Sequence, residues 1–112
     1  MTAAIHPAKV LVTPTEISEV LIVEPRVFGD ERGWFTESFN AQNFSAATNL
    51  DLEFVQDNHS FSLESTLRGM HYQEFPHQET KLVRCTRGKV YEVLLDLRSK
   101  SPTYKFDSIV PS

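Results

Sequence analysis

The sequence has 112 residues, of which 40% are apolar, and its 15 acidic and 11 basic side chains give a formal net charge of −4. This length fits one small domain, and the acidic balance argues against a protein dedicated to nucleic acid. No apolar run approaches the ~20 residues of a membrane span, and the first residues lack the pattern of a secretory signal. The single cysteine, Cys85, excludes an internal disulfide. We therefore expect a cytoplasmic protein that binds neither nucleic acid nor a membrane.

In the first half of the chain, residues 1–18 are predicted to form a loose N-terminus that contains one short strand. Gly and Asp residues at Gly29–Gly33 predict a turn. Asn40 can cap a short helix over residues 40–48. Apolar, β-branched or aromatic runs predict strands at Lys9–Thr13, Glu19–Glu24 and Trp34–Phe39.

In the second half, a two-residue hairpin turn is predicted at Arg87-Gly88, and Gly69 is typical of a β-bulge. The spacing of about seven short strands with one helix predicts an all-β sandwich or barrel with an exposed edge at its last strand. The strands of this half are expected at Phe54–Phe61, Thr66–Gln73, Lys81–Thr86, Lys89–Leu97 and Tyr104–Val110.

Chemically reactive side chains are densest between Arg68 and Lys81, where His71 lies between two cationic residues. Histidine accepts a proton near neutral pH. Cationic side chains stabilise the oxygen that becomes negative when a proton leaves the carbon beside a carbonyl. Arg68 and His71 would point to opposite faces of a regular strand, so a bulge at Gly69 is needed to bring them together. From the spacing alone, a purely structural histidine is the alternative.

Two further groups are candidates for binding. Phe28 can stack on a planar ring and Arg32 can form paired hydrogen bonds with a phosphate, although a simple hairpin turn explains both. Gln56 and Asn58 share one strand face, which suits either a sugar or solvent. The region from Lys81 to Lys100 contains six basic and two acidic residues, and this composition suits a small anion or a solvated surface.

A metal site is not predicted, because the sequence has no His-x-His pair and Gln73 is a poor ligand. The candidate ligands for a metal would be His59, His71 and His77, with Glu79 as a fourth. Cys85 follows the apolar Val83 by two residues, which favours a buried, inert thiol over a nucleophile.

From about Val20 to Val110 the chain resembles the dTDP-4-dehydrorhamnose 3,5-epimerase family of cupin-like proteins. The resemblance implies an all-β, cupin-like jelly-roll or β-sandwich with one short helix near 40–48. Residues 19–112 would then form the N-terminal portion of one such domain, truncated at its C-terminal end. Several blocks in the same order carry the resemblance: Glu24–Gly33, Phe54–Ser60, Leu67–Gln73, Lys81–Cys85 and Asp96–Arg98.

The resemblance also implies a reaction. His71 would be the base that removes the protons at C3 and C5 of a dTDP-linked 4-keto-6-deoxy sugar, while Arg68 and Lys81 hold the enolate oxygen. The product would be dTDP-4-dehydro-L-rhamnose, an intermediate of dTDP-L-rhamnose biosynthesis. No metal and no organic cofactor are implied. A pocket for the nucleotide sugar would be lined by Phe28, Arg32, Glu37, Gln56 and Asn58, with the first three serving the partner in a homodimer.

One departure from the family concerns length. Family members continue well beyond residue 112, and the later part supplies the tyrosine acid and the carboxylate that orients the histidine. We therefore expect an incomplete chain. A 3-only or 5-only epimerase, a ketoisomerase and a non-catalytic fragment that binds a sugar nucleotide are the alternatives.

Overall fold

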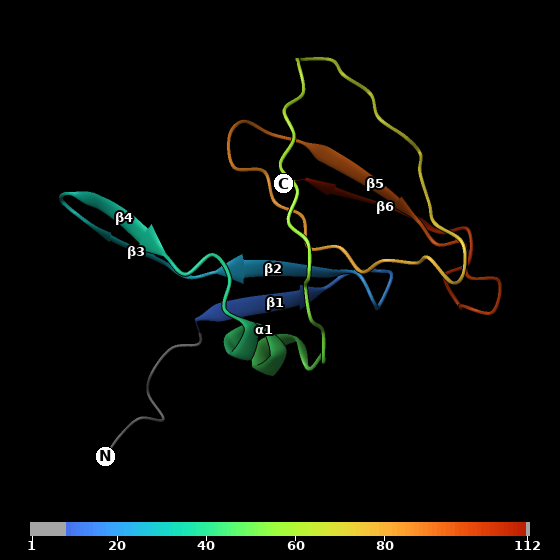
Figure 1. Ribbon diagram of the computed structural model, residues 1–112, viewed down its shortest axis with the longest axis horizontal. Coiled ribbons are helices and arrows are strands. Elements are labelled where there is room, and N and C mark those ends of the chain that lie inside the picture. The colour runs from blue at the N-terminus through green and yellow to red at the C-terminus, as the bar shows by residue number, and fades with distance from the viewer. Residues whose placement is uncertain (1–8, 112) are drawn as a thin grey trace.

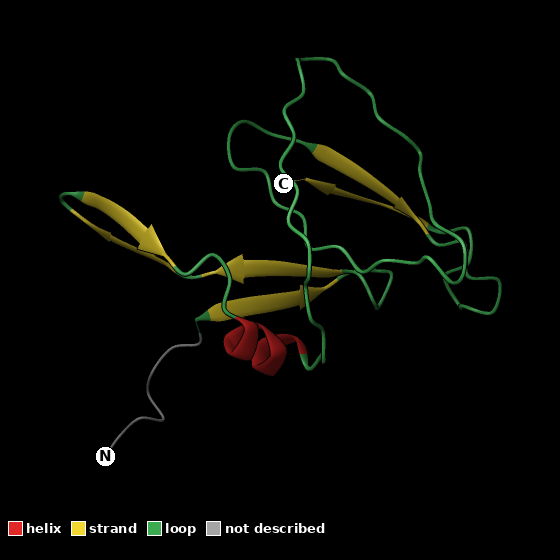
Figure 2. Ribbon diagram, in the orientation of Figure 1, coloured by secondary structure: helices red, strands yellow, loops and turns green. Residues whose placement is uncertain are grey.

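The computed structural model describes residues 9–111 and contains six strands and one helix. The strands form three antiparallel two-stranded sheets (Figure 1), so the β-rich class expected from the sequence is confirmed. Figure 2 shows that a long loop connects the helix to the last sheet. The sheets are β1 (Val10–Pro14) with β2 (Leu21–Pro25), β3 (Val27–Asp30) with β4 (Gly33–Thr36), and β5 (Tyr91–Leu95) with β6 (Asp107–Pro111).

The β1–β2 sheet pairs Val12 with Val23, close to where both strands were predicted. The segment that connects β1 to β2 is stabilised by the Thr15 hydroxyl, which donates hydrogen bonds to the carbonyl oxygens of Ile17 and Val20 at 2.8 Å each. Ile17 is one of two apolar residues buried within residues 9–111. The part of the predicted N-terminal segment that covers residues 1–8 lies outside the described residues.

The β3–β4 hairpin confirms the turn predicted at Gly29–Gly33. Asp30 pairs with Gly33 across the two-residue loop, and Gly33 has a φ of 139°, which a side chain would make unfavourable. The second strand ends at Thr36 rather than at the predicted Phe39, because β3 offers no partner beyond Val27. In Figure 1 this hairpin projects away from the other sheets.

Helix α1 (Ala41–Thr48) confirms the predicted helix. The Asn40 side chain accepts a hydrogen bond from the Asn43 backbone N–H at 2.9 Å, which satisfies a donor that has no partner inside the helix. At the other end Asn49 adopts a left-handed conformation, a common helix stop. The buried Phe44 packs against Phe39 and Phe54, with ring centroids 5.6 and 5.7 Å away, and α1 contacts β1.

Residues 49–90 contain no helix or strand, which makes several predictions wrong. An extended run becomes a strand only by pairing with a neighbour, and these runs pair with no strand within residues 9–111. Gly69 has a positive φ of 110°. It does not form the predicted β-bulge, because residues 49–90 contain no strand. The incorrect elements are the strands at Phe54–Phe61, Thr66–Gln73 and Lys81–Thr86 and the Arg87-Gly88 hairpin.

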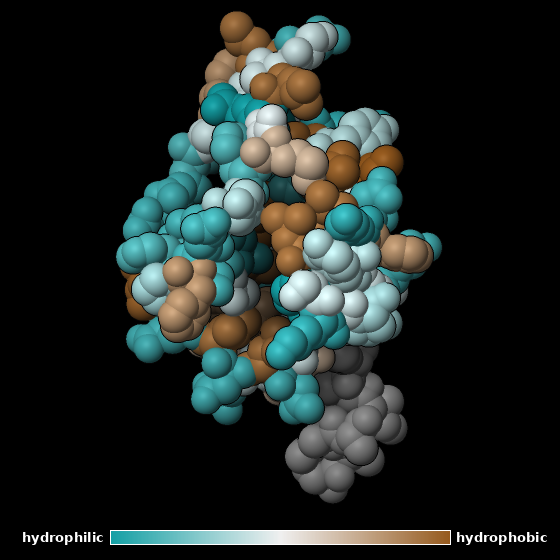
Figure 3. All heavy atoms as spheres, turned by 90° about the vertical axis from the view of Figure 1, so that its right-hand side faces the viewer, coloured by the Kyte–Doolittle hydropathy of each residue, from teal (hydrophilic) through white to brown (hydrophobic). Residues whose placement is uncertain are grey.

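The last two predicted strands exist but are shorter, as β5 and β6. Many large apolar side chains are exposed, among them Val55, Leu67 and Phe75, each more than 80% accessible. Figure 3 shows apolar side chains along a hollowed face of the molecule. No helix in the described part of the chain is long and apolar enough to cross a membrane.

Candidate functional site

The three predicted catalytic side chains, Arg68, His71 and Lys81, lie exposed on the long loop between α1 and β5. The Arg68 guanidinium is held by Ser62, whose Oγ accepts from Nε at 2.9 Å, and by the Phe61 carbonyl, which accepts from a terminal nitrogen at 3.3 Å. Within residues 9–111 neither Arg68 nor Lys81 forms an ion pair. Their positive charges are therefore not neutralised by a neighbouring carboxylate in that part of the chain.

Gly69 shapes the backbone beside His71. A Cβ atom placed on Gly69 would lie 3.5 Å from both the backbone nitrogen and Nδ1 of His71. The space is sufficient, but the φ of 110° at Gly69 strains any residue with a side chain. Glycine is therefore required by the backbone that presents His71.

The β3–β4 hairpin carries two of the predicted binding residues, Phe28 and Arg32. Both line a hollow of about 280 Å³ with Asp30, Trp34 and Phe35 among its other walls. The Arg32 guanidinium hydrogen bonds to Asp30 at 2.7 Å and holds the pKa of that carboxyl below its usual value.

The other three predicted binding residues lie in two places. Gln56 donates a hydrogen bond to Asn58 over 3.1 Å, so the two amides do share one side of the chain, in an exposed segment. Glu37 is half-buried just after β4 and accepts a hydrogen bond from Asn43 Nδ2 at 2.7 Å.

No three His, Cys, Asp or Glu side chains of the described chain are close enough together to hold a metal ion, so His59, His71, His77 and Glu79 do not assemble there. Cys85 is partly exposed rather than buried. Its thiol lies 3.2 Å from the Arg87 carbonyl oxygen.

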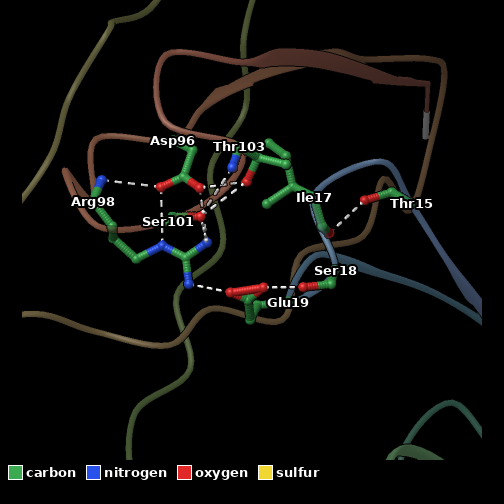
Figure 4. A network of polar contacts seen from close by, with 8 residues as sticks. All are labelled: Thr15, Ile17, Ser18, Glu19, Asp96, Arg98, Ser101 and Thr103. Atoms are coloured by element: carbon green, nitrogen blue, oxygen red, sulfur yellow. Dashed lines mark hydrogen bonds and ion pairs between the residues drawn. The ribbon is translucent and has the colours of Figure 1, made fainter.

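The Asp96 carboxylate is the centre of a polar network that the sequence analysis did not assign (Figure 4). Its side chain is only 2% exposed. It accepts hydrogen bonds from Arg98, at 2.9 Å from Nε and 2.8 Å from a terminal nitrogen, and from the Thr103 hydroxyl at 2.6 Å. Bonding to Arg98, and then to Thr103, holds the Asp96 pKa far below its usual value. The same contact with Asp96 raises the Arg98 pKa.

Arg98 also links distant parts of the chain. Its guanidinium forms an ion pair with Glu19, which in turn accepts a hydrogen bond from Ser18. Figure 4 shows these side chains joining the β1–β2 connection to the loop that follows β5. The only sequence signal was the Asp96-Leu97-Arg98 block, because nothing local indicates a partner 79 residues away.

The described residues form a β-rich protein whose long loop carries His71 between two cationic residues of the sequence, Arg68 and Lys81. More specifically, the chain belongs to the dTDP-4-dehydrorhamnose 3,5-epimerase family, whose model matches residues 14–110.

Known relatives support this family at the level of sequence. A dTDP-4-dehydrorhamnose 3,5-epimerase of Shigella flexneri is 56% identical over 93 residues, which are 83% of this chain and 51% of the relative. The Escherichia coli (strain K12) enzyme is 51% identical over 90 residues, which are 80% of this chain and 49% of the relative. The chain thus spans about half the length of the curated relatives it matches.

Solved structures of dTDP-4-dehydrorhamnose 3,5-epimerases also match this chain. The dTDP-4-dehydrorhamnose 3,5-epimerase of Elizabethkingia anophelis NUHP1 matches with a TM-score of 0.84 at 40% identity, covering 92% of this chain and 56% of that one. The Bacillus anthracis enzyme, with TDP and PPi bound, has a TM-score of 0.85 at 41% identity, covering 91% of this chain and 58% of that one. The predicted cupin-like fold is therefore confirmed.

Proposed function

We propose that this chain carries the proton-abstracting part of a dTDP-4-dehydrorhamnose 3,5-epimerase. The observation that carries the proposal is the position of His71 on a loop with Arg68 and Lys81, neither of them paired with an acid within residues 9–111. The 4-keto group of the sugar acidifies the C–H bonds at C3 and C5. His71 accepts each proton in turn, and the two cations stabilise the enolate oxygen.

The ligand we propose is a dTDP-linked 4-keto-6-deoxy sugar. The TDP in the Bacillus anthracis relative supports a nucleotide of this kind. Phe28 offers a ring for stacking, Arg32 a guanidinium for the diphosphate, and the Gln56 and Asn58 amides suit the hydroxyls of a sugar. Because Arg32 is paired with Asp30, binding a diphosphate would exchange one anionic partner for another.

We further propose a cytoplasmic homodimer that uses neither a metal nor an organic cofactor. In Figure 1 the β3–β4 hairpin extends away from the other sheets. Phe28, Arg32 and Glu37 lie on it or directly after it, and we propose that they complete the pocket of a second copy. Residues 19–112 would be the N-terminal portion of one jelly-roll domain.

Proton exchange tests this proposal directly. The 112-residue chain is incubated with dTDP-4-keto-6-deoxyglucose in D₂O, and proton NMR follows the loss of signal at C3 and C5. We expect His71→Ala to slow exchange by about 10²–10⁴-fold, the usual contribution of a general base. His77→Ala on the same loop is the matched control and keeps the parent rate. Equal exchange in the parent and in His71→Ala would contradict the proposal.

The carbon that exchanges distinguishes related reactions. Deuterium at C3 alone or at C5 alone would indicate a single-site epimerase, and formation of a 3-keto sugar a ketoisomerase. A non-catalytic sugar-nucleotide binder is the second candidate, favoured by the exposure of His71 and Arg68. It predicts TDP binding without exchange at either carbon.

A further inference from the structure

Glu37 has one defined polar partner. Its Oε2 accepts a hydrogen bond from Asn43 Nδ2 over 2.7 Å, in a half-buried position. Within residues 9–111 this carboxylate makes no other side-chain hydrogen bond and no ion pair. One oxygen is therefore fixed by a neutral donor, while Oε1 keeps its capacity to accept a hydrogen bond.

Asn43 is itself firmly placed. Its backbone N–H donates to the Asn40 side chain at the start of α1, at 2.9 Å. The next residue, Phe44, is buried against the rings of Phe39 and Phe54. The helix start and the aromatic cluster together fix the backbone from which the Asn43 amide reaches Glu37.

We propose that Asn43 is a positioning residue for Glu37, one that holds its carboxylate so that Oε1 faces a hydrogen-bond donor of the bound nucleotide. This inference rests on the proposed function, which includes Glu37 in the nucleotide-sugar pocket. The donor is an O–H or N–H group of the ligand, because a carboxylate repels the diphosphate. Pre-orienting the carboxylate lowers the cost of ordering it when the nucleotide binds.

A purely structural role for Asn43 would show itself in the stability of the fold. Alanine favours a helix more than asparagine does, and the capping hydrogen bond uses the backbone N–H, which Asn43→Ala retains. A positioning role therefore predicts weaker nucleotide binding in a variant that keeps its helix content and a cooperative thermal transition, with a midpoint lowered only by the lost Asn43–Glu37 hydrogen bond. Loss of binding through loss of structure would instead abolish the cooperative transition.

Calorimetric titration with TDP and, separately, with pyrophosphate tests the proposal on the 112-residue chain. We expect Asn43→Ala to weaken TDP binding about fivefold to tenfold, in line with the loss of one oriented hydrogen bond, and to leave pyrophosphate binding unchanged. Asn43→Asp should weaken TDP binding more, because its carboxylate repels Glu37. Gln42→Ala, an exposed neighbour on the same helix, is the matched control.

A double-mutant cycle with Glu37→Gln completes the test. If the two sites are coupled, Asn43→Ala causes little further loss of TDP affinity in a chain that already carries Glu37→Gln. Unchanged TDP affinity in Asn43→Ala, or an equal loss for TDP and pyrophosphate, would overturn the inference. The proposed reaction is judged separately: absence of His71-dependent exchange would overturn it, whereas the affinity ratios alone decide the role of Asn43.

Discussion

The Asp96 side chain is almost completely enclosed although it carries a charge. Its carboxylate is retained in ionised form because Arg98 and Thr103 donate hydrogen bonds to it. Arg98 also forms an ion pair with Glu19, so one guanidinium binds two carboxylates. We interpret this cluster as the main polar contact that fixes the β1–β2 connection against the loop after β5.

This cluster predicts how stability depends on pH. The folded-state pKa of Asp96 lies below its ordinary value of 3.8, so its contribution is complete above that value and is lost as pH falls below it. Asp96→Asn should therefore lower the thermal midpoint at neutral pH, and the difference from the parent should shrink as the pH falls from about 4 to about 2. Thermal melts followed by circular dichroism at each pH measure the midpoints of the parent and of Asp96→Asn.

The matched control is Asp51→Asn, which removes an exposed carboxylate. We expect it to leave the thermal midpoint close to that of the parent at each pH. A constant difference between the parent and Asp96→Asn across the whole range would contradict the assignment of the carboxylate as the titrating group.

Among the elements, α1 depends most visibly on one side chain. Asn40 caps it, and Asn40→Ala removes the acceptor for the Asn43 N–H. We expect a loss of about 1 kcal/mol in the free energy of unfolding, as is usual for such caps. Urea denaturation of the 112-residue chain gives this value directly.

Asn40→Asp is the informative comparison, because aspartate caps a helix about as well as asparagine. It should keep most of the parent stability. If both variants lost the same free energy, the role of Asn40 would lie in another contact than the helix cap.

At the scale of the whole molecule, the amount of exposed apolar surface is the dominant feature. Trp34 and Phe35 on the hairpin are 74% and 70% exposed, and exposed aromatic side chains are frequent anchors of protein interfaces. We therefore predict that the chain associates through this hairpin. Trp34→Ser with Phe35→Ser should weaken the dimer by at least about tenfold in sedimentation velocity, since buried aromatic anchors dominate interfaces.

Phe75 supplies the control for that experiment. It is 83% exposed but lies on the long loop, outside the hairpin, so Phe75→Ser should keep the parent dimer. A monomer at high protein concentration in the parent, or equal weakening by both sets of substitutions, would refute the hairpin as the dimer contact.

The sequence by itself determined the elements that rest on local signals. The Asn40 cap, the Gly29–Gly33 turn and the β-branched run before Pro25 each act within a few residues, and the structure confirms the helix, that turn and the first two strands. Ordered motif blocks likewise identified the family. The amides of Gln56 and Asn58 are joined by a hydrogen bond, although the strand on which their predicted common face rested does not form.

Only the tertiary structure decided which extended runs became strands and which side chains met across the chain. Residues 54–61, 66–73 and 81–86 have strand-like composition, but a ladder needs a neighbour with free backbone groups, and none pairs with them within residues 9–111. Arg98 meets Glu19 across 79 positions, and the Asn43 amide reaches Glu37 only once the helix has formed. Such contacts depend on the path of the whole backbone, which no local pattern of residues encodes.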